Sequence, residues 1–358
     1  MTTRSPFHSR SIAAAALGGA IFCFGTMGLN AAANGSSSDA VISPDTWRQV
    51  PRGSLGRRFA NSGDFEATTR KFKGGEIRIA LSSGGLQGKK SELLGWVDRA
   101  ASAVINYYGK FPVTRLTLVV VVDDGDGIHA GNERGGRLIT IKMGERTRAS
   151  DFDDDWHLTH EFFHLGFPDV PDEYHWMEEG LSTYLEPLAR ARVGQLSAER
   201  IWKDMVEGMP QGLPKKGDRG LDHTPTWGRT YWGGALFWLM ADVEIRERTG
   251  NRRSLDDAIR AIWSEGGDGS ADWSVARVLR EGDHATGLSV LTELHAQMGD
   301  KPVDVDLSAL WKRLGVIYQN RRVTFDDSAP LAFVRTALTK RVDSDASVAN
   351  HQAAATDY

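Results

Sequence analysis

The sequence predicts an α+β protein in which a sheet-bearing lobe comes first and a helical lobe follows. Strand and helix patterns alternate in residues 61–150, whereas helical periodicity dominates residues 151–340, where Gly and Pro separate the helices. Composition agrees with a globular protein, because 41% of the 358 residues are hydrophobic and 25% are charged.

The first lobe is expected to hold one sheet with a helix packed on it. Strands are predicted at Glu76–Leu81, at the β-branched run Leu116–Val122 and at Leu138–Met143. The amphipathic segment Ser91–Tyr108 predicts the helix.

The second lobe is expected to be helical almost throughout. A short strand at Val316–Phe325 and a last helix at Leu331–Leu338 are predicted near its end. The preceding apolar periods predict helices at 154–166, 177–192, 197–208, 230–249, 254–264, 272–282, 286–298 and 307–314.

The two ends of the chain are expected to lie outside the fold. Basic residues Arg4 and Arg10, an almost uncharged stretch from Ile12 to Leu29 and small residues at 31–33 predict a signal peptide over residues 1–33. The protein is therefore expected to be exported to the periplasm or the extracellular space, without stable membrane insertion after cleavage; an uncleaved single-pass anchor is the alternative. Residues 34–60 are predicted to be a flexible linker, and residues 341–358 a disordered tail.

The cysteine content and the charge balance argue against disulfides, thiolate chemistry and nucleic-acid binding. The only cysteine, Cys23, lies in the predicted signal, so the mature chain is expected to lack disulfides and thiolate chemistry unless Cys23 is kept for lipid attachment. The balance of 43 Lys and Arg against 47 Asp and Glu gives a net charge of −4, without a long basic run. Nucleic acid is thus not an expected partner, and the sequence leaves the oligomeric state open.

One motif carries metal chemistry: His160-Glu161-Phe162-Phe163-His164. On a helix, residues four apart share a face, so both imidazoles can bind one metal ion while Glu161 takes a proton from water. The competing interpretation is a pair of hydrogen-bonded helix histidines. A third ligand is available on the predicted helix that follows, where Glu178 and Glu179 are both candidates.

The motif together with Trp176, Glu179 and Gly180 resembles the gluzincin (thermolysin-clan) zinc metallopeptidases, in particular the aminopeptidase N and glycyl aminopeptidase branch. The resemblance covers roughly residues 110–320 and implies a thermolysin-like fold with one Zn²⁺ per chain. It implies His160, His164 and Glu179 as the zinc ligands and Glu161 as the general base. Glu178 stays a second candidate for the third ligand.

Two further segments resemble the same branch. Tyr231, in Tyr231-Trp232-Gly233-Gly234-Ala235, matches the tyrosine that hydrogen-bonds the oxyanion in the family. Glu133, in a degenerate match over 130–140, corresponds to the residue that binds a substrate's free α-amino group. An extended peptide is then expected to pair with the edge of strand Leu138–Met143.

These residues predict a zinc-dependent peptidase, with an aminopeptidase as one form, that acts on a peptide or protein substrate. The alternatives are a non-catalytic peptide- or partner-binding protein on the same fold, and a metal-dependent hydrolase of a non-peptide substrate. Carboxylates at 151–155 are expected to cap the metal-binding helix rather than bind calcium. His157 and His175 flank the motif, and the sequence assigns them no role.

Overall fold

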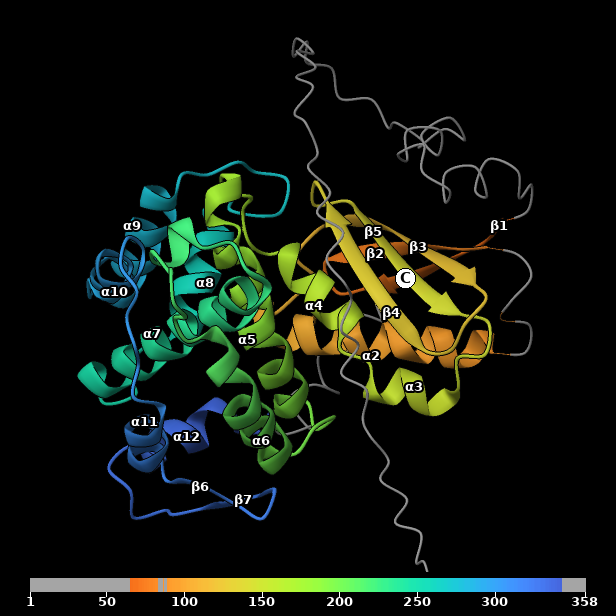
Figure 1. The fold of residues 1–358 in the computed structure, drawn as a ribbon. Helices are drawn as coiled ribbons and strands as arrows, with labels where there is room; N and C mark the ends of the chain where they lie inside the picture. The colour runs from red at the N-terminus through yellow and green to blue at the C-terminus, as the bar shows by residue number, and fades with distance from the viewer. Residues whose placement is uncertain (1–64, 83–85, 87–88, 343–358) are drawn as a thin grey trace, which may run out of the picture. The chain divides into compact units, whose positions relative to one another are not determined.

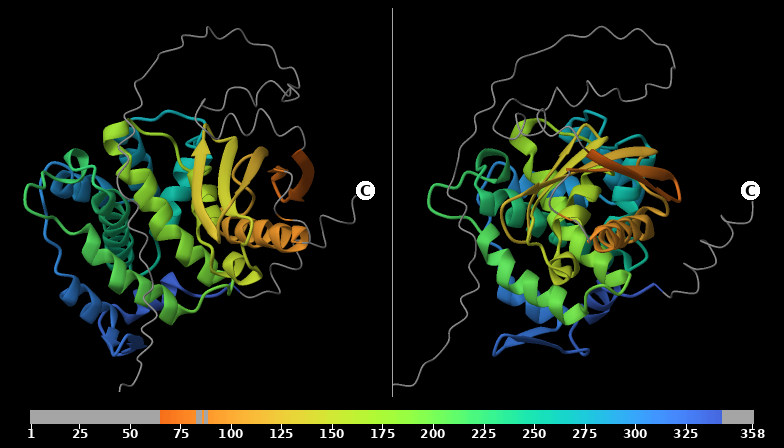
Figure 2. Two further views of the ribbon diagram at one scale, coloured as in Figure 1. Left: turned by 45° about the vertical axis from the view of Figure 1, so that its right-hand side comes forward. Right: turned by 90° about the vertical axis from the view of Figure 1, so that its right-hand side faces the viewer.

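A computed structural model describes residues 65–82, 86 and 89–342, which all lie in one compact unit spanning Arg52–Tyr358. The predicted signal (1–33), the predicted linker (34–60) and nearly all of the predicted tail (341–358) lie outside the described residues. In the described residues, the sheet lies on one side of this unit and most of the helices on the other (Figures 1 and 2).

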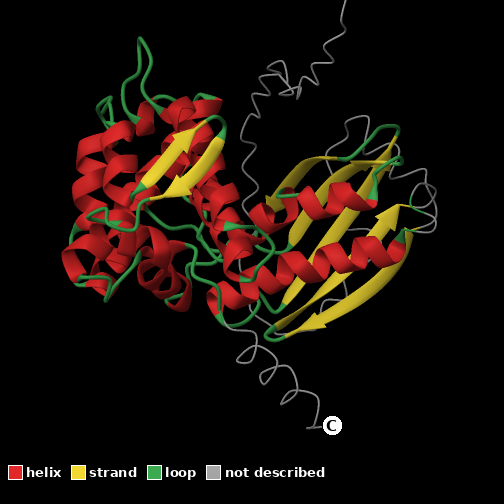
Figure 3. Cartoon of the chain, turned by 90° about the horizontal axis from the view of Figure 1, so that it is seen from below, coloured by secondary structure: helices red, strands yellow, loops and turns green. Residues whose placement is uncertain are grey.

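The sheet has five strands in the order β1-β2-β3-β5-β4. The three central strands, β2 (Gly75–Ser82), β3 (Arg115–Asp123) and β5 (Leu138–Gly144), are parallel, and β1 (Phe65–Phe72) and β4 (Ile128–Arg134) flank them in antiparallel pairing. Helix α2 (Lys90–Tyr108) crosses one face of the sheet (Figure 3). Its buried side chains join those of the sheet in one hydrophobic core.

The position of Leu138–Met143 corrects the sequence prediction. This segment forms β5, but β5 pairs with β3 on one side and with β4 on the other. On this side of the sheet the edge strand is therefore β4, which the sequence did not predict as a strand, and the expected peptide pairing with 138–143 is wrong. Both sides of β5 are already paired, so an added strand finds unpaired backbone groups on β4 here, or on β1 at the opposite edge of the sheet.

The predicted helix 154–166 is shorter in the structure, where it forms α4 (His157–His164), and a separate helix that the sequence did not predict, α3 (Ala149–Asp154), precedes it. The break lies at Asp155, whose carboxylate accepts a hydrogen bond from the backbone N–H of Leu158 at 3.2 Å. This contact satisfies a free donor of the first turn, which confirms a capping role for Asp155. Asp151 instead caps α3 through the backbone N–H of Arg148 at 2.7 Å.

The helical part follows the predicted order with small shifts of the ends. The predicted helix 230–249 begins as a π-helix at Gly228–Gly233 and continues as α7 (Gly234–Thr249), and the predicted strand 316–325 is a hairpin of β6 (Val316–Gln319) and β7 (Arg322–Phe325). The remaining helices are α5 (Trp176–Arg192), α6 (Ala198–Gly208), α8 (Leu255–Ser264), α9 (Val275–Thr286), α10 (Val290–Met298), α11 (Leu307–Leu314) and α12 (Ala332–Leu338). No helix among the described residues is long and apolar enough to cross a bilayer.

Helix α4 lies between the sheet and the later helices and packs against β4, α2 and α5. Phe162 and Phe163 are fully buried. The Phe162 ring meets Phe111 edge-on with 5.3 Å between ring centroids, and Phe163 meets Tyr107 at the same distance. These aromatic pairs fix the inner face of α4, so its opposite face presents His160 and His164.

Candidate metal centre and cleft

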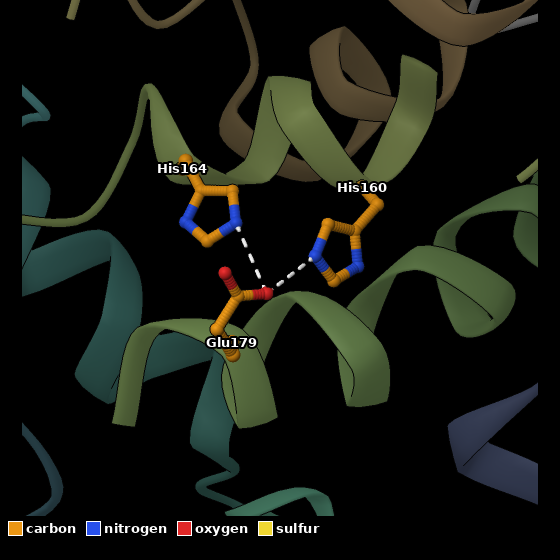
Figure 4. Close-up of side chains that lie close together, drawn as sticks. All are labelled: His160, His164 and Glu179. Carbon is orange, nitrogen blue, oxygen red and sulfur yellow. Dashed lines mark hydrogen bonds and ion pairs between the residues drawn. The ribbon is translucent and has the colours of Figure 1, made fainter. Parts of the chain in front are cut away.

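Two imidazoles and one carboxylate meet between α4 and α5 (Figure 4). The Nε2 atoms of His160 and His164 lie 3.0 Å and 3.7 Å from Oε2 of Glu179. One ligand atom from each residue lies within 4.8 Å of the other two. His160 is buried, and the other two side chains are nearly so. The sequence-predicted triad is thus brought together by two neighbouring helices.

This arrangement fits zinc in donor type and spacing. Tetrahedral zinc with bonds of about 2.0–2.1 Å separates its ligand atoms by roughly 3.3 Å, which lies between the two distances above. Two neutral imidazoles and one carboxylate leave a fourth position open, as in catalytic rather than structural zinc sites. Among the described residues, this is the one group of His, Cys, Asp and Glu side chains spaced to hold a metal ion.

The charges of the triad favour a bound cation. Burial by itself raises the pKa of Glu179, but the hydrogen bond with His160 and the pairing with nearby His164 outweigh it and hold this pKa well below its usual value. Burial lowers the pKa of His164, and its pairing with the Glu179 carboxylate overcomes this effect and raises the pKa to about 9. The metal-free site therefore holds a proton that a metal ion displaces on binding.

Glu178, the other candidate ligand, faces away from the histidine pair. Its Oε1 accepts a hydrogen bond from the backbone N–H of Val170 at 2.7 Å. Its Oε2 lies 3.2 Å from Nδ1 of His175. Glu178 thus ties the loop after α4 to the start of α5, and of the two glutamates it is Glu179 that lies against the histidine pair.

His175 belongs to the site, although the sequence analysis gave it no role. Its Nε2 lies 3.1 Å from Oε1 of Glu179, the oxygen that does not face the histidine pair. Hydrogen bonds to Glu178 and Glu179 raise the pKa of His175 to about 10. The helical spacing of these residues could have predicted the contacts, because His175 stands three and four residues before the two glutamates on the same helical face.

Helices α5 and α7 approach closely because two glycines meet where they cross. A Cβ atom on Gly180 would lie 2.4 Å from Cα of Gly234, and one on Gly234 would lie 2.2 Å from the backbone oxygen of Trp176. Gly180 directly follows Glu179, and Gly234 stands three residues after Tyr231. The glycine contact therefore sets the distance between the third ligand and Tyr231.

Tyr231 lies beside the triad, on the π-helix that precedes α7. Its ring is stacked on that of His160 with 6.2 Å between centroids. Burial raises the pKa of Tyr231, and the charges of Glu179 and Glu161 raise it further. The hydroxyl group therefore stays protonated and can donate a hydrogen bond at any physiological pH.

Glu161 faces the edge strand β4. A Cβ atom on Gly131 would lie 2.5 Å from Oε1 of Glu161, so only a glycine lets the strand come this close. Glu161 is 8% exposed. Burial raises its pKa, and the nearby His164 and His160 partly offset this effect. A carboxylate with a raised pKa beside a candidate metal position has the properties of a general base.

Glu133 also lies on β4, close enough to His164 and Glu161 for their charges to act on it. One of its carboxylate oxygens accepts a hydrogen bond from the backbone N–H of Gly136 at 2.6 Å. Burial raises its pKa to about 7. The structure thus brings every sequence-predicted site residue into one region, between α4, α5, the π-helix and β4.

The α+β fold of the described residues has a counterpart among the solved aminopeptidase structures. The chain is similar to an aminopeptidase N family protein from Idiomarina loihiensis, with a TM-score of 0.56 and 17% sequence identity over 72% of this chain and 50% of that one. An M1 zinc metallopeptidase from Deinococcus radiodurans gives a TM-score of 0.46 and 16% identity over 68% and 55% of the two chains. The first likeness confirms the predicted fold class.

The comparison covers only part of these proteins, because the chain spans about half the length of the solved structures it matches. No protein-family model matches the sequence, and no curated protein matches it. At these identities the likeness concerns the fold alone.

Proposed function

We propose that this protein is a zinc-dependent peptidase that hydrolyses peptide bonds with Glu161 as the general base. The observation that carries the proposal is the convergence of His160, His164 and Glu179 beside a buried carboxylate and a protonated tyrosine. A scaffold that only binds a partner has no use for a general base next to an open ligand position.

Each residue has a defined task in this reaction. Zinc held by the triad would act as a Lewis acid that makes water nucleophilic near neutral pH. Glu161 takes the proton of the attacking water and delivers it to the leaving amine. Tyr231 donates its hydroxyl hydrogen to the oxygen that becomes negative when the carbonyl carbon turns tetrahedral.

The proposal extends to aminopeptidase action, with Glu133 as the carboxylate that holds a free α-amino group. Glu133 stands on the edge strand, where a peptide that pairs with β4 would pass Glu161. A cation at this position restores the charged form of Glu133 by direct electrostatic attraction. Substrates with an acetylated N-terminus lack that cation and are expected to be cleaved poorly.

The test is a mixed peptide library with free and acetylated N-termini, incubated with the zinc-loaded protein and analysed by mass spectrometry. Release of single N-terminal residues from free peptides, lost on chelation, is the expected result. Internal cuts in both sets would replace the aminopeptidase with an endopeptidase. The matched control is Glu161→Gln, which should keep zinc and lose about 10²- to 10⁴-fold in kcat; a zinc-loaded wild type that cleaves nothing contradicts the proposal.

Export is the second part of the proposal and is supported by the basic and apolar pattern of residues 1–33. Expression of the full sequence in a bacterial host and N-terminal sequencing of the product test it. Cleavage after the small residues at 31–33 is the expected result, and an uncleaved protein held in the membrane fraction would support the anchor instead.

A further inference from the structure

Four aromatic rings form a row through the candidate site. Trp156 lies edge-on to His160 with 5.3 Å between ring centroids, His160 is stacked on Tyr231 at 6.2 Å, and Tyr231 is stacked on Trp227 at 5.8 Å. The two inner members are a candidate metal ligand and the candidate oxyanion donor. The two outer members are tryptophans, one from the start of α4 and one directly before the π-helix.

Both tryptophans at the ends of the row are exposed, Trp156 by 45% and Trp227 by 61%. They differ in this from the eight other tryptophans of the described residues, none of which is exposed. Six of those eight are buried in the core: Trp96, Trp176, Trp202, Trp238, Trp273 and Trp311. Exposed tryptophan is thus confined, in the described part of the chain, to the two residues that touch the site.

The exposed rings are held in place rather than loose. Trp156 is stacked on His157 with 4.1 Å between centroids and an interplanar angle of 21°, and Trp227 is stacked on Tyr231 at 27°. Each stands four residues before its partner in the row, so the helical backbone fixes the pair on one face. A large apolar ring kept rigid in water is poised to bury its surface against a ligand.

We infer that Trp156 and Trp227 bind substrate, and that the preferred substrates are peptides with an aromatic or large aliphatic side chain next to the scissile bond. The inference rests on the proposed function. A flat apolar side chain extends the stack at either end of the row and covers a ring that otherwise faces water. The occupant is the substrate because the row passes through His160 and Tyr231, where the scissile carbonyl has to lie.

The test compares kcat/KM for four peptides that differ only in the residue next to the scissile bond: Phe, Leu, Ala or Arg. The wild-type ratio of Phe to Ala should be at least roughly tenfold, the size of one aromatic contact. Trp227→Ala or Trp156→Ala should bring the ratio down toward one, whereas Trp227→Phe should retain most of it. The ratio is the readout because a disturbed Tyr231 would slow all four peptides equally.

The control is Phe333→Ala, because Phe333 is 44% exposed on α12 and outside the row. It should leave the ratio unchanged. A wild-type enzyme without preference for Phe and Leu, or one that prefers the Arg peptide through cation–π stacking, overturns the inference. So does a ratio that survives both alanine substitutions.

Failure of the proposed function is distinguished by binding. If the zinc-loaded wild type cleaves none of the four peptides, the peptidase proposal fails, and calorimetric titration of the same peptides decides the role of the tryptophans. Tighter binding of the Phe peptide, lost in Trp227→Ala or Trp156→Ala, upholds the inference for a binding protein. Equal binding of all four peptides overturns it.

Discussion

The helix pair α4–α5 and the edge strand β4 enclose the same site and are built in different ways. Helix α4 is anchored by fully buried aromatic side chains, and α5 is held close to α7 by a contact between glycines. Strand β4 contains no buried residue and pairs on one side only, with an irregular register at Ile128 and Ala130. The side formed by α4 and α5, the helix side, is therefore tightly packed, and the side formed by β4, the strand side, is an open backbone edge.

This difference separates two requirements of the proposed chemistry. Ligands have to be fixed before the metal arrives, because each ångström of misplacement weakens binding. A peptide substrate instead needs backbone N–H and C=O groups that are still free to pair. Gly131 connects the two sides, since it lets the open edge reach Glu161 on the rigid helix.

The largest effect is expected from a substitution on the helix side, at Glu179. Glu179→Gln removes the charge that faces both histidines, so zinc affinity should fall by more than about a hundredfold. Glu178→Gln is the matched control, because its carboxylate faces Val170 and His175 and not the histidine pair. Competition with a chelator of known affinity measures both variants. Loss of zinc from Glu178→Gln with retention by Glu179→Gln would reverse the ligand assignment.

The second prediction concerns Gly131, where β4 approaches Glu161 on α4. Gly131→Ala places a Cβ atom within 2.5 Å of Oε1 of Glu161, so either the carboxylate or the strand has to move. We expect kcat/KM to fall by about a hundredfold at full zinc content, because the general base loses its alignment. Asn132→Ala, at the exposed neighbouring position, should change little. Activity near that of the wild type in Gly131→Ala would show that β4 does not constrain Glu161.

The helix side could be predicted from the sequence far better than the strand side, for a physical reason. The positions of His160 and His164 follow from local helical periodicity. Glu179 lies on the next long helix, α5, which a short connection joins to α4. Strand β4 has few β-favouring residues, and its pairing with β5 depends on contacts that no local pattern records. The start of α4 after Asp155 and the contact of His175 with Glu179 likewise depend on side-chain hydrogen bonds, which periodicity does not encode.

The third prediction concerns His175 on the helix side. His175 holds the outer oxygen of Glu179, so His175→Gln should weaken zinc binding by about tenfold without removing a ligand. His223→Gln is the control, because His223 is similarly exposed and pairs with Asp300 away from the triad. The chelator assay used for Glu179 reports both dissociation constants. Equal zinc affinity in the wild type and His175→Gln would show that the contact between His175 and Glu179 does not contribute to zinc binding.

The smallest expected effect is a pH dependence of the unfolding free energy that comes from Glu133 on β4. Burial raises the pKa of Glu133 from 4.5 to about 7, so the folded protein binds a proton that the unfolded chain has released. The stability that this group contributes is full below pH 4.5 and is lost as the pH rises through about 7. Relative to Glu133→Gln, the zinc-free wild type should lose on the order of 1 kcal/mol of unfolding free energy over that range.

Urea unfolding of both chelated proteins at several pH values between 4 and 8 measures the difference between their unfolding free energies. Glu133→Gln keeps an acceptor for the backbone N–H of Gly136, so the comparison isolates the charge. Curves that run parallel across the range would mean that the Glu133 carboxylate is as well solvated on β4 as in the unfolded chain. A difference that grows with pH would show that the open edge holds a carboxylate at an energetic cost, which a substrate's amino group can offset on binding.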